Sequence, residues 1–247
     1  MKKITLRGID FDNVTMEEAV SLAEKALEEQ YSISVFTPNA EIAQLAVESS
    51  EIRDLLAHAD LLLPDGAGIV LASEILKKPL KEKVAGVDFG ERILSIAAQN
   101  NYPVFFLGGK PGIATLAAQK KQESYPSLSV AGTNDGYFNK EGIENDTVIE
   151  KINESGAQIL FVCFGAPTQE KWIDKNKDRL PSVRLFLGLG GALDVYAETV
   201  KRAPEFFIRA RLEWFYRLLK EPRRIGRMMK LPKYILGTYL EKFSSEK

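Results

Sequence analysis

Residues 61–68 read Leu-Leu-Leu-Pro-Asp-Gly-Ala-Gly, and this segment indicates the fold class. Three consecutive leucines are typical of a short strand that is buried on both faces, and Pro64 ends the strand because proline has no N–H to donate to a sheet ladder. Asp65 therefore follows the carboxyl end of a strand, which is where ligands bind in open α/β sheets. The flanking glycines leave the backbone beside the carboxylate uncovered. The alternative is that Asp65 only caps a helix that begins near Ala67.

Other apolar runs end in the same way, in a glycine or proline turn that carries polar side chains. Four of them are predicted strands, at residues 32–36, 103–107, 158–164 and 183–187. The segments between them have the apolar periodicity of helices, and alternating strands and helices are typical of a parallel sheet. We therefore predict an α/β protein with a Rossmann-like, mostly parallel sheet flanked by helices. The polar turns then lie at one edge of the sheet and share one cleft.

The N-terminal segment is predicted to contain one strand, at residues 4–9, and a turn at residues 10–13. Asp10 and Asp12 in this turn have the Asp-x-Asp spacing that holds a divalent metal in many sugar-nucleotide enzymes. No third ligand is close in the sequence, so turn chemistry is favoured. A single cysteine and a single histidine also exclude an intramolecular disulfide and disfavour a structural zinc site.

Two polar residues follow the predicted strand 32–36. Thr37 is expected to cap the next helix, with Pro38 at the first helical position. The amide of Asn39 then has no structural role, so we expect it to contact a ligand. If this strand neighbours the one at residue 61, then Thr37, Asn39 and Asp65 surround one pocket.

A glycine-rich turn at Gly108 and Gly109 separates a predicted strand from a predicted helix. This arrangement offers backbone N–H groups and a positive helix end to a phosphate. The spacing is not Gly-x-Gly-x-x-Gly, so it indicates a nucleotide more strongly than NAD. Tyr137, in a later loop, either stacks on a base or packs against its own domain. Gln169 and Asp194 follow two further predicted strands at the same edge.

The C-terminal segment differs in charge from the rest of the chain. Residues 199–247 contain 13 Lys or Arg against 5 Asp or Glu, whereas residues 1–198 contain 20 against 29. We predict an α/β catalytic domain at 1–198 and a basic, amphipathic helical appendage at 199–247. Such a segment either packs its apolar side on the domain or lies on an anionic membrane surface. The net negative charge of the first part and the lack of a binding motif disfavour nucleic acid.

Six ordered motifs resemble those of the WecG/TagA/CpsF glycosyltransferases. They are TPNAE at 37–41, PDGAGIV at 64–70, VAGVD at 84–88, GAPTQE at 165–170, KRAP at 201–204, and EWFYRL at 213–218 followed by EPRR at 221–224. The resemblance covers the chain from about residue 4 to about residue 230. Six motifs in order are far more specific than any one of them alone.

The resemblance implies transfer of N-acetylmannosamine from its UDP sugar to N-acetylglucosamine on undecaprenyl diphosphate, for the linkage unit of wall teichoic acid. It implies inversion at the transferred sugar, with no metal and no cofactor. Carried over residue by residue, Asp65 is the catalytic base, and Thr37, Asn39 and Gln169 line the pocket. Lys83 stands where the family usually has arginine, so a two-pronged contact to a phosphate becomes a point charge there.

An inverting transfer needs a base for the acceptor hydroxyl and positive charge at the departing diphosphate. Without metal ligands, that charge must come from helix ends and arginines, and we expect Arg217, Arg224 or Arg227 to supply it. No apolar run is long enough for a membrane-spanning helix. We therefore expect a cytoplasmic protein that associates peripherally with the inner face of the cell membrane, where its lipid-linked acceptor lies.

Other functions are compatible with parts of the sequence. Within the family, the donor is alternatively the UDP sugar of N-acetylmannosamine uronic acid or of glucose. The glycine turn alone also allows a nicotinamide-dependent oxidoreductase, and the C-terminal segment alone allows a non-catalytic adaptor at a membrane surface. An apolar C-terminal segment can also pack on a second copy of the chain, which would give a homo-oligomer.

Overall fold

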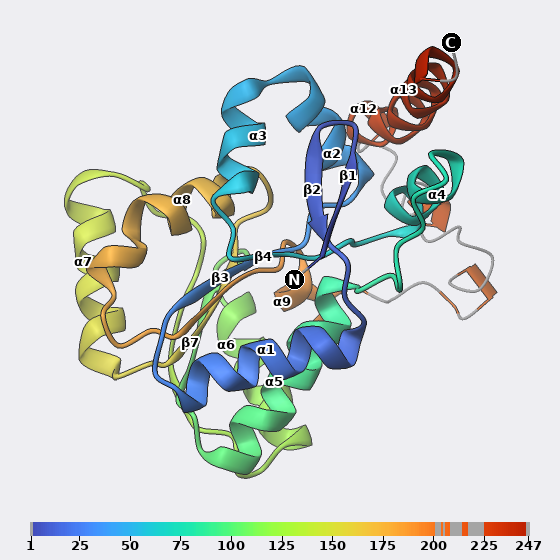
Figure 1. Ribbon diagram of the computed structural model, residues 1–247. Coiled ribbons are helices and arrows are strands. Elements are labelled where there is room, and N and C mark those ends of the chain that lie inside the picture. The colour runs from blue at the N-terminus through green and yellow to red at the C-terminus, as the bar shows by residue number, and fades with distance from the viewer. Residues whose placement is uncertain (1, 201–203, 205, 208–213, 217–224, 246–247) are drawn as a thin grey trace.

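The computed structural model describes residues 2–200, 204, 206–207, 214–216 and 225–245. Within these residues a parallel sheet of six strands lies at the centre, in the order β4-β3-β8-β7-β5-β6 (Figure 1). Its strands are β3 (Ile33–Phe36), β4 (Leu61–Leu62), β5 (Val104–Gly108), β6 (Val130–Asn134), β7 (Ile159–Cys163) and β8 (Leu185–Gly188). Neighbouring strands are all parallel, so their carboxyl ends lie at one edge. The predicted fold class is confirmed.

Helices cover both faces of the sheet because successive strand residues point to opposite sides. Val35 and Phe161 belong to the core on one face, whereas Phe36 and Val162 belong to the core on the other. The first layer consists of α1 (Met16–Glu28), α5 (Gly86–Asn100), α6 (Ile113–Ser124) and α9 (Ala192–Tyr196). The second consists of α2 (Ala40–Glu48), α3 (Ser50–Ala57), α7 (Gly142–Ser155) and α8 (Thr168–Asn176), with the short helix η1 (Lys177–Arg179) after α8.

An antiparallel hairpin of β1 (Lys3–Leu6) and β2 (Ile9–Asp12) precedes the sheet. Arg7 and Gly8 form its turn with φ of 51° and 78°, and two-residue hairpin turns of this hand need positive φ at both positions. The predicted single strand followed by a turn is therefore wrong, because the chain reverses at Gly8, within the apolar run.

Asp12 ends β2 and is buried, whereas the sequence indicated a turn at this position. Its Oδ2 accepts a hydrogen bond from Leu62 N at 2.8 Å, so the carboxylate occupies the place of a further strand beside the edge strand β4. Burial raises the pKa of Asp12, although the bond from Leu62 opposes the shift. Asp10 accepts a hydrogen bond from Thr5 Oγ1 at 2.6 Å, so the two acids have separate structural partners.

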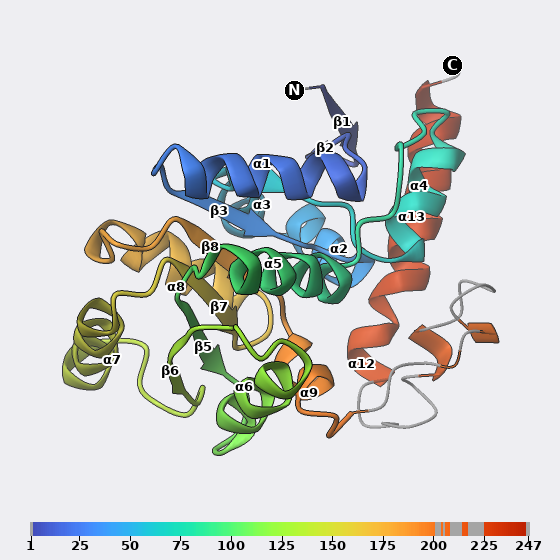
Figure 2. The ribbon, with the colours of Figure 1, turned by 90° about the horizontal axis from the view of Figure 1, so that it is seen from below.

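The C-terminal helix α13 (Lys230–Ser245) follows α12 (Ile225–Met228) and packs against α2 and α4 (Ala67–Ile75) (Figure 2). Tyr234 and Thr238 are fully buried in this contact. The prediction of a helical C-terminal segment is confirmed for the part that the structure describes.

Arg7 joins the hairpin to this helix. Its Nη1 donates to Gln44 Oε1 and to the carbonyl oxygen of Tyr234, both at 3.3 Å. The guanidinium carbon also lies 5.5 Å from the centroid of the Tyr234 ring. Gly237 allows this approach, since an added Cβ there would overlap the guanidinium.

Other side chains of the C-terminal segment are apolar and exposed. Within the part of this segment that the structure describes, they are Val200, Phe206, Phe215, Ile225, Met229, Leu236, Tyr239, Leu240 and Phe243. Among the described residues, none of the helices combines the length and the apolar character that crossing a membrane requires.

Candidate active site

The carboxyl edge of the sheet brings several predicted site residues together. Thr37 follows β3, Asp65 follows β4, and Gln169 follows β7. Two glycines connect these three residues. Gly86 is in contact with Thr37 and Asp65, and Gly188 is in contact with Thr37 and Gln169. The sequence predicted a shared edge, but it did not indicate that these glycines form the contacts.

Asp65 lies at the amino end of α5. Its Oδ2 accepts a hydrogen bond from the N–H of Gly86, the first residue of that helix, at 3.3 Å. The positive end of a helix favours an anion at this position. The alternative that Asp65 caps α4 is wrong, since Gly66 is the N-cap, with φ of 83°, and no side chain caps that helix. The half-buried carboxylate is therefore held by a different helix from the one that follows it.

Thr37 contacts the same part of α5. A Cβ added at Gly86 would lie 2.7 Å from Thr37 Oγ1, so only glycine allows α5 to begin this close to Thr37. Thr37 Oγ1 donates to the carbonyl oxygen of Gly188, at the end of β8, at 3.3 Å. The predicted N-cap role of Thr37 is wrong, because its hydroxyl joins β3 to β8 instead.

Asn39 is the N-cap of α2, although the sequence reasoning gave it no structural role. Its Oδ1 accepts hydrogen bonds from Glu41 N at 2.9 Å and Ile42 N at 3.2 Å. Asparagine is as good an N-cap as threonine, and Asn39 has the extended backbone that the position requires. The cap uses only the carbonyl oxygen, so the exposed side chain still presents its amide nitrogen.

Gln169 is buried in the first turn of α8. Its Oε1 accepts a hydrogen bond from Gly190 N at 2.9 Å, and its Nε2 donates to Glu170 Oε1 at 2.9 Å. A Cβ added at Gly188 would lie 3.3 Å from Gln169 Nε2, so the amide nitrogen rests against the strand end that Thr37 also contacts.

Glu170 was missed as a separate site residue by the sequence reasoning. It is 1% exposed, and burial raises the pKa of its carboxyl group to about 7, although the hydrogen bond from Gln169 opposes the shift. The only signal in the sequence was an acidic residue directly after Gln169, in a helix whose next turn contains the apolar residues Trp172 and Ile173.

The glycine turn lies where the chain connections diverge, since β5 leads to β6 on one side and β7 leads to β8 on the other. A Cβ at Gly108 would overlap the carbonyl oxygen of Cys163 on β7. Gly109 N donates to that same oxygen at 3.1 Å, so its N–H is committed to the sheet and does not point to a ligand. The amino end of α6, which starts at Ile113, is the part of this turn that can still face an anion.

The other predicted binding residues occupy separate positions. Tyr137 is 69% exposed and is not packed into the core. Asp194 lies in α9 and is close enough to Cys163 that its charge adds to burial in raising the pKa of that thiol to about 12. Lys83 is half-buried and precedes Val84, whose N–H donates to the carbonyl oxygen of Pro64. The backbone at Lys83 therefore lies beside the segment that carries Asp65.

The predicted arginines lie at the limit of what the structure describes. Arg217 and Arg224 lie outside the described residues, and the side chain of Arg227, in α12, is also outside them. Within the described residues, no group of three or more His, Cys, Asp or Glu is arranged to hold a metal ion.

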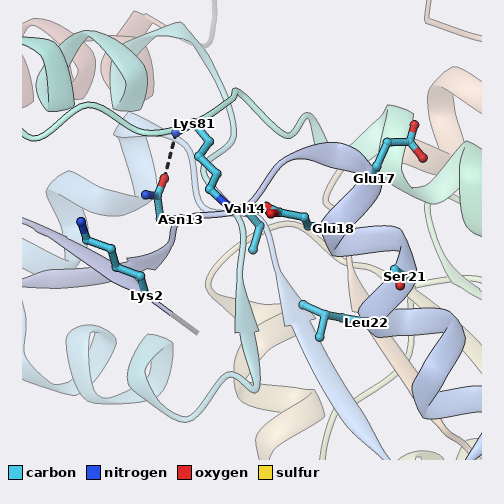
Figure 3. Close-up of a pocket in the computed structure, with 8 residues that line it drawn as sticks. All are labelled: Lys2, Asn13, Val14, Glu17, Glu18, Ser21, Leu22 and Lys81. Atoms are coloured by element: carbon cyan, nitrogen blue, oxygen red, sulfur yellow. Dashed lines mark hydrogen bonds and ion pairs between the residues drawn. The ribbon is translucent and has the colours of Figure 1, made fainter.

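A groove of about 730 Å³ lies beside α1 and is lined by none of the predicted site residues (Figure 3). Three of its charged side chains have ion-pair partners, since Lys81 Nζ binds Glu18 Oε1 at 2.6 Å and Glu17 Oε1 binds Arg92 Nη1 at 2.7 Å. Lys81 N also donates to Asn13 Oδ1 at 2.8 Å. These polar groups already have partners, so the groove is a weaker candidate for the chemistry than the sheet edge.

The sheet edge has the parts of a group-transfer enzyme: a carboxylate that can accept a proton, a hydroxyl and two amides on segments at the same edge, and helix amino ends that can face an anion. Comparison with known proteins agrees with this class. Residues 4–247 match the glycosyl transferase WecG/TagA/CpsF family. The chain belongs to this family and is a glycosyltransferase.

Similar proteins come from several bacteria. A protein of Bacillus spizizenii (strain ATCC 23059 / NRRL B-14472 / W23) is 34% identical over 248 residues, which cover 100% of this chain and 95% of the relative. A protein of Bacillus subtilis (strain 168) is 32% identical and covers 98% and 93%. A protein of Staphylococcus aureus (strain MRSA252) is 34% identical and covers 93% and 89%. All three are named N-acetylglucosaminyldiphosphoundecaprenol N-acetyl-beta-D-mannosaminyltransferase.

Proposed function

We propose that the protein transfers N-acetylmannosamine from UDP-N-acetylmannosamine to the 4-hydroxyl of N-acetylglucosamine on undecaprenyl diphosphate, with inversion. The names of the three relatives support this acceptor and this transferred sugar. The observation that carries the chemistry is the position of Asp65, whose carboxylate lies at the amino end of α5 next to Gly86.

Asp65 is the catalytic base in this proposal. It takes the proton of the acceptor hydroxyl while the acceptor oxygen bonds to the anomeric carbon of the donor sugar. The bond from that carbon to the diphosphate oxygen breaks on the opposite face, and UDP leaves. Thr37, Asn39 and Gln169 hold the sugars, because their segments meet around Gly86 and Gly188.

The departing diphosphate needs positive charge, and the residues that the structure describes contain no group of three or more His, Cys, Asp or Glu that could hold a metal ion to supply it. We assign this role to Lys83, beside the Asp65 segment, and to Arg217, Arg224 and Arg227 from the C-terminal segment. In this arrangement residues 199–247 complete an active site that residues 1–198 begin.

The C-terminal segment also associates with the membrane in this proposal. Leu236, Leu240 and Phe243 are each more than 60% exposed on α13, and the segment carries an excess of basic residues. Apolar side chains among basic ones suit the surface of an anionic membrane, and the proposed acceptor is lipid-linked. The proposed location is therefore the inner face of the cell membrane.

Asp65→Asn tests the chemistry, because it keeps the shape of the side chain and removes the base. With UDP-N-acetylmannosamine and a short-chain GlcNAc-diphospholipid, we expect kcat/KM to fall by roughly 10² to 10⁴. The rise in melting temperature on adding UDP should be retained. A variant that turns over at the wild-type rate would show that Asp65 is not the base.

Donor choice is tested by the same assay. UDP-N-acetylmannosamine is compared with the UDP sugars of its uronic acid and of glucose, and product mass identifies the sugar transferred. Faster turnover of either competitor would replace the proposed donor. A melting temperature that rises with NAD but not with UDP would support the oxidoreductase alternative, since a ligand of the native state stabilises it.

A further inference from the structure

Glu170 is a buried acid that the proposed chemistry does not use. Its side chain is 1% exposed, and its Oε1 accepts a hydrogen bond from Gln169 Nε2 at 2.9 Å. Its Oε2 is buried and has no hydrogen-bond partner among the described residues. A carboxyl group in such a place is costly, because burial disfavours its charged form. An apolar side chain of similar size would not carry this cost.

The contact with Gln169 gives the acid a specific use. Gly190 N–H can only donate, so it binds the oxygen of the Gln169 amide. A carboxylate oxygen of Glu170 accepts from the other end of the amide, which must then be the nitrogen. The two contacts together select one of the two orientations of the amide and fix its rotation.

The orientation matters because of what lies beside the amide nitrogen. Nε2 has two hydrogens, and Glu170 uses one of them. The nitrogen rests against Gly188, whose carbonyl oxygen accepts the hydrogen bond from Thr37 Oγ1. The second hydrogen is therefore held next to the strand end that Thr37 contacts, at the proposed sugar site.

We propose that Glu170 is a positioning residue, whose carboxyl group holds the Gln169 amide so that its second Nε2 hydrogen is presented to a substrate oxygen. The inference rests on the proposed transfer reaction, because that reaction supplies the substrate that Gln169 contacts. Glu170 itself touches no substrate and acts only through Gln169.

A double-mutant cycle tests this dependence. Gln169→Leu, Glu170→Leu and the double variant are compared with wild type by kcat/KM for the transfer reaction. We expect each single change to lower kcat/KM about tenfold or more, and the double variant to be no worse than Gln169→Leu, because Glu170 has nothing to position once the amide is gone. Glu170→Gln keeps an acceptor oxygen and should recover most of the loss seen in Glu170→Leu.

A control separates positioning from simple loss of stability. Asn176 is buried at the other end of α8, where its amide bonds Asn145 and the carbonyl oxygen of Trp172. Asn176→Ala should lower the melting temperature and leave kcat/KM unchanged. Losses that multiply in the Gln169 and Glu170 double variant, or a Glu170→Gln variant as impaired as Glu170→Leu, would overturn the proposal.

An NMR measurement keeps this inference distinct from the proposed function. The side-chain NH₂ of Gln169, assigned by its absence in Gln169→Leu, should give two separate and slowly exchanging proton signals. In Glu170→Leu the two signals should exchange rapidly with water and shift toward the positions of an exposed amide, while slow rotation about the amide C–N bond keeps them separate. If the signals behave this way and no UDP sugar is turned over by wild type, the proposed function fails and the positioning contact stands. If the signals are identical in both proteins, the positioning role is refuted whatever the activity.

Discussion

Replacing Glu170 by glutamine should change how the stability of the protein depends on pH. Burial raises the pKa of this carboxyl group from its usual value of 4.5 to about 7. Between these two values the folded protein binds the proton that the unfolded chain releases, so the free energy of unfolding falls as pH rises. The loss is absent below pH 4.5 and complete above pH 7.

The expected size follows from the shift. One pKa unit corresponds to about 1.4 kcal/mol, so the full loss is roughly 3 kcal/mol, and about 2 to 3 kcal/mol of it falls between pH 5 and pH 8. Glu170→Gln does not titrate and should lack this loss. The variant should therefore gain about 2 to 3 kcal/mol in stability relative to wild type over this range.

Urea unfolding followed by circular dichroism, at pH 5, 6, 7 and 8, measures both proteins under matched conditions. Subtracting the two curves removes the other titrating groups, including Asp12, whose pKa is also raised by burial. A difference that stays constant across the four pH values would refute the reasoning, because Glu170 would then titrate like an exposed carboxyl group.

Three further predictions concern other contacts. Gly86→Ala places a Cβ 2.7 Å from Thr37 Oγ1, so this variant should lose roughly 1 to 3 kcal/mol of stability and most of the activity. The control for stability is Gly226→Ala, because an added Cβ there has nothing within 4 Å. An unchanged melting curve for Gly86→Ala would contradict the close approach. Arg7→Ala removes the hydrogen bonds to Gln44 and Tyr234, so amide hydrogen exchange in α13 should become faster while exchange in β7 stays slow. Unchanged exchange in α13 would show that Arg7 does not hold this helix in place. Leu240→Glu and Phe243→Glu should each weaken binding to anionic vesicles about tenfold, because each replaces an exposed apolar side chain by a charge. Ser244→Glu adds the same charge at an exposed polar position and should have a smaller effect. Equal effects of all three variants would refute an apolar contact with lipid.

The fold could be predicted because its strands are local apolar runs with clear ends. Leu61 to Leu63, followed by Pro64, indicated a buried strand whose carboxyl end carries Asp65, and the structure has this order. The position of Thr37 and Gln169 at the same edge followed from the parallel sheet alone, because parallel strands share one carboxyl edge. These inferences needed only the order of the elements.

The contacts of the site could not be predicted, because they join segments that are distant in the sequence. One hydrogen-bond partner of Asp65 is Gly86, on a helix that begins 21 residues later. The hydroxyl of Thr37 was expected at a helix end and instead bonds to Gly188, 151 residues away. Asn39, not Thr37, is the N-cap of α2. N-cap propensity could not choose between the two residues, because asparagine and threonine are both good N-caps. The buried state of Glu170 depends on α8 packing against the sheet, which a single motif does not reveal.

The bond between Arg7 and the carbonyl oxygen of Tyr234 closes a loop across 227 residues of the chain. Such a contact forms late, because the sheet between its two ends must first bring them together. During synthesis α13 is made after every strand of the sheet, so the surfaces of α2 and α4 against which it packs stay exposed to solvent until then. Since α2 and α4 follow Asn39 and Asp65, the two helices that begin after these candidate site residues gain their contacts with α13 only after the sheet has been synthesised.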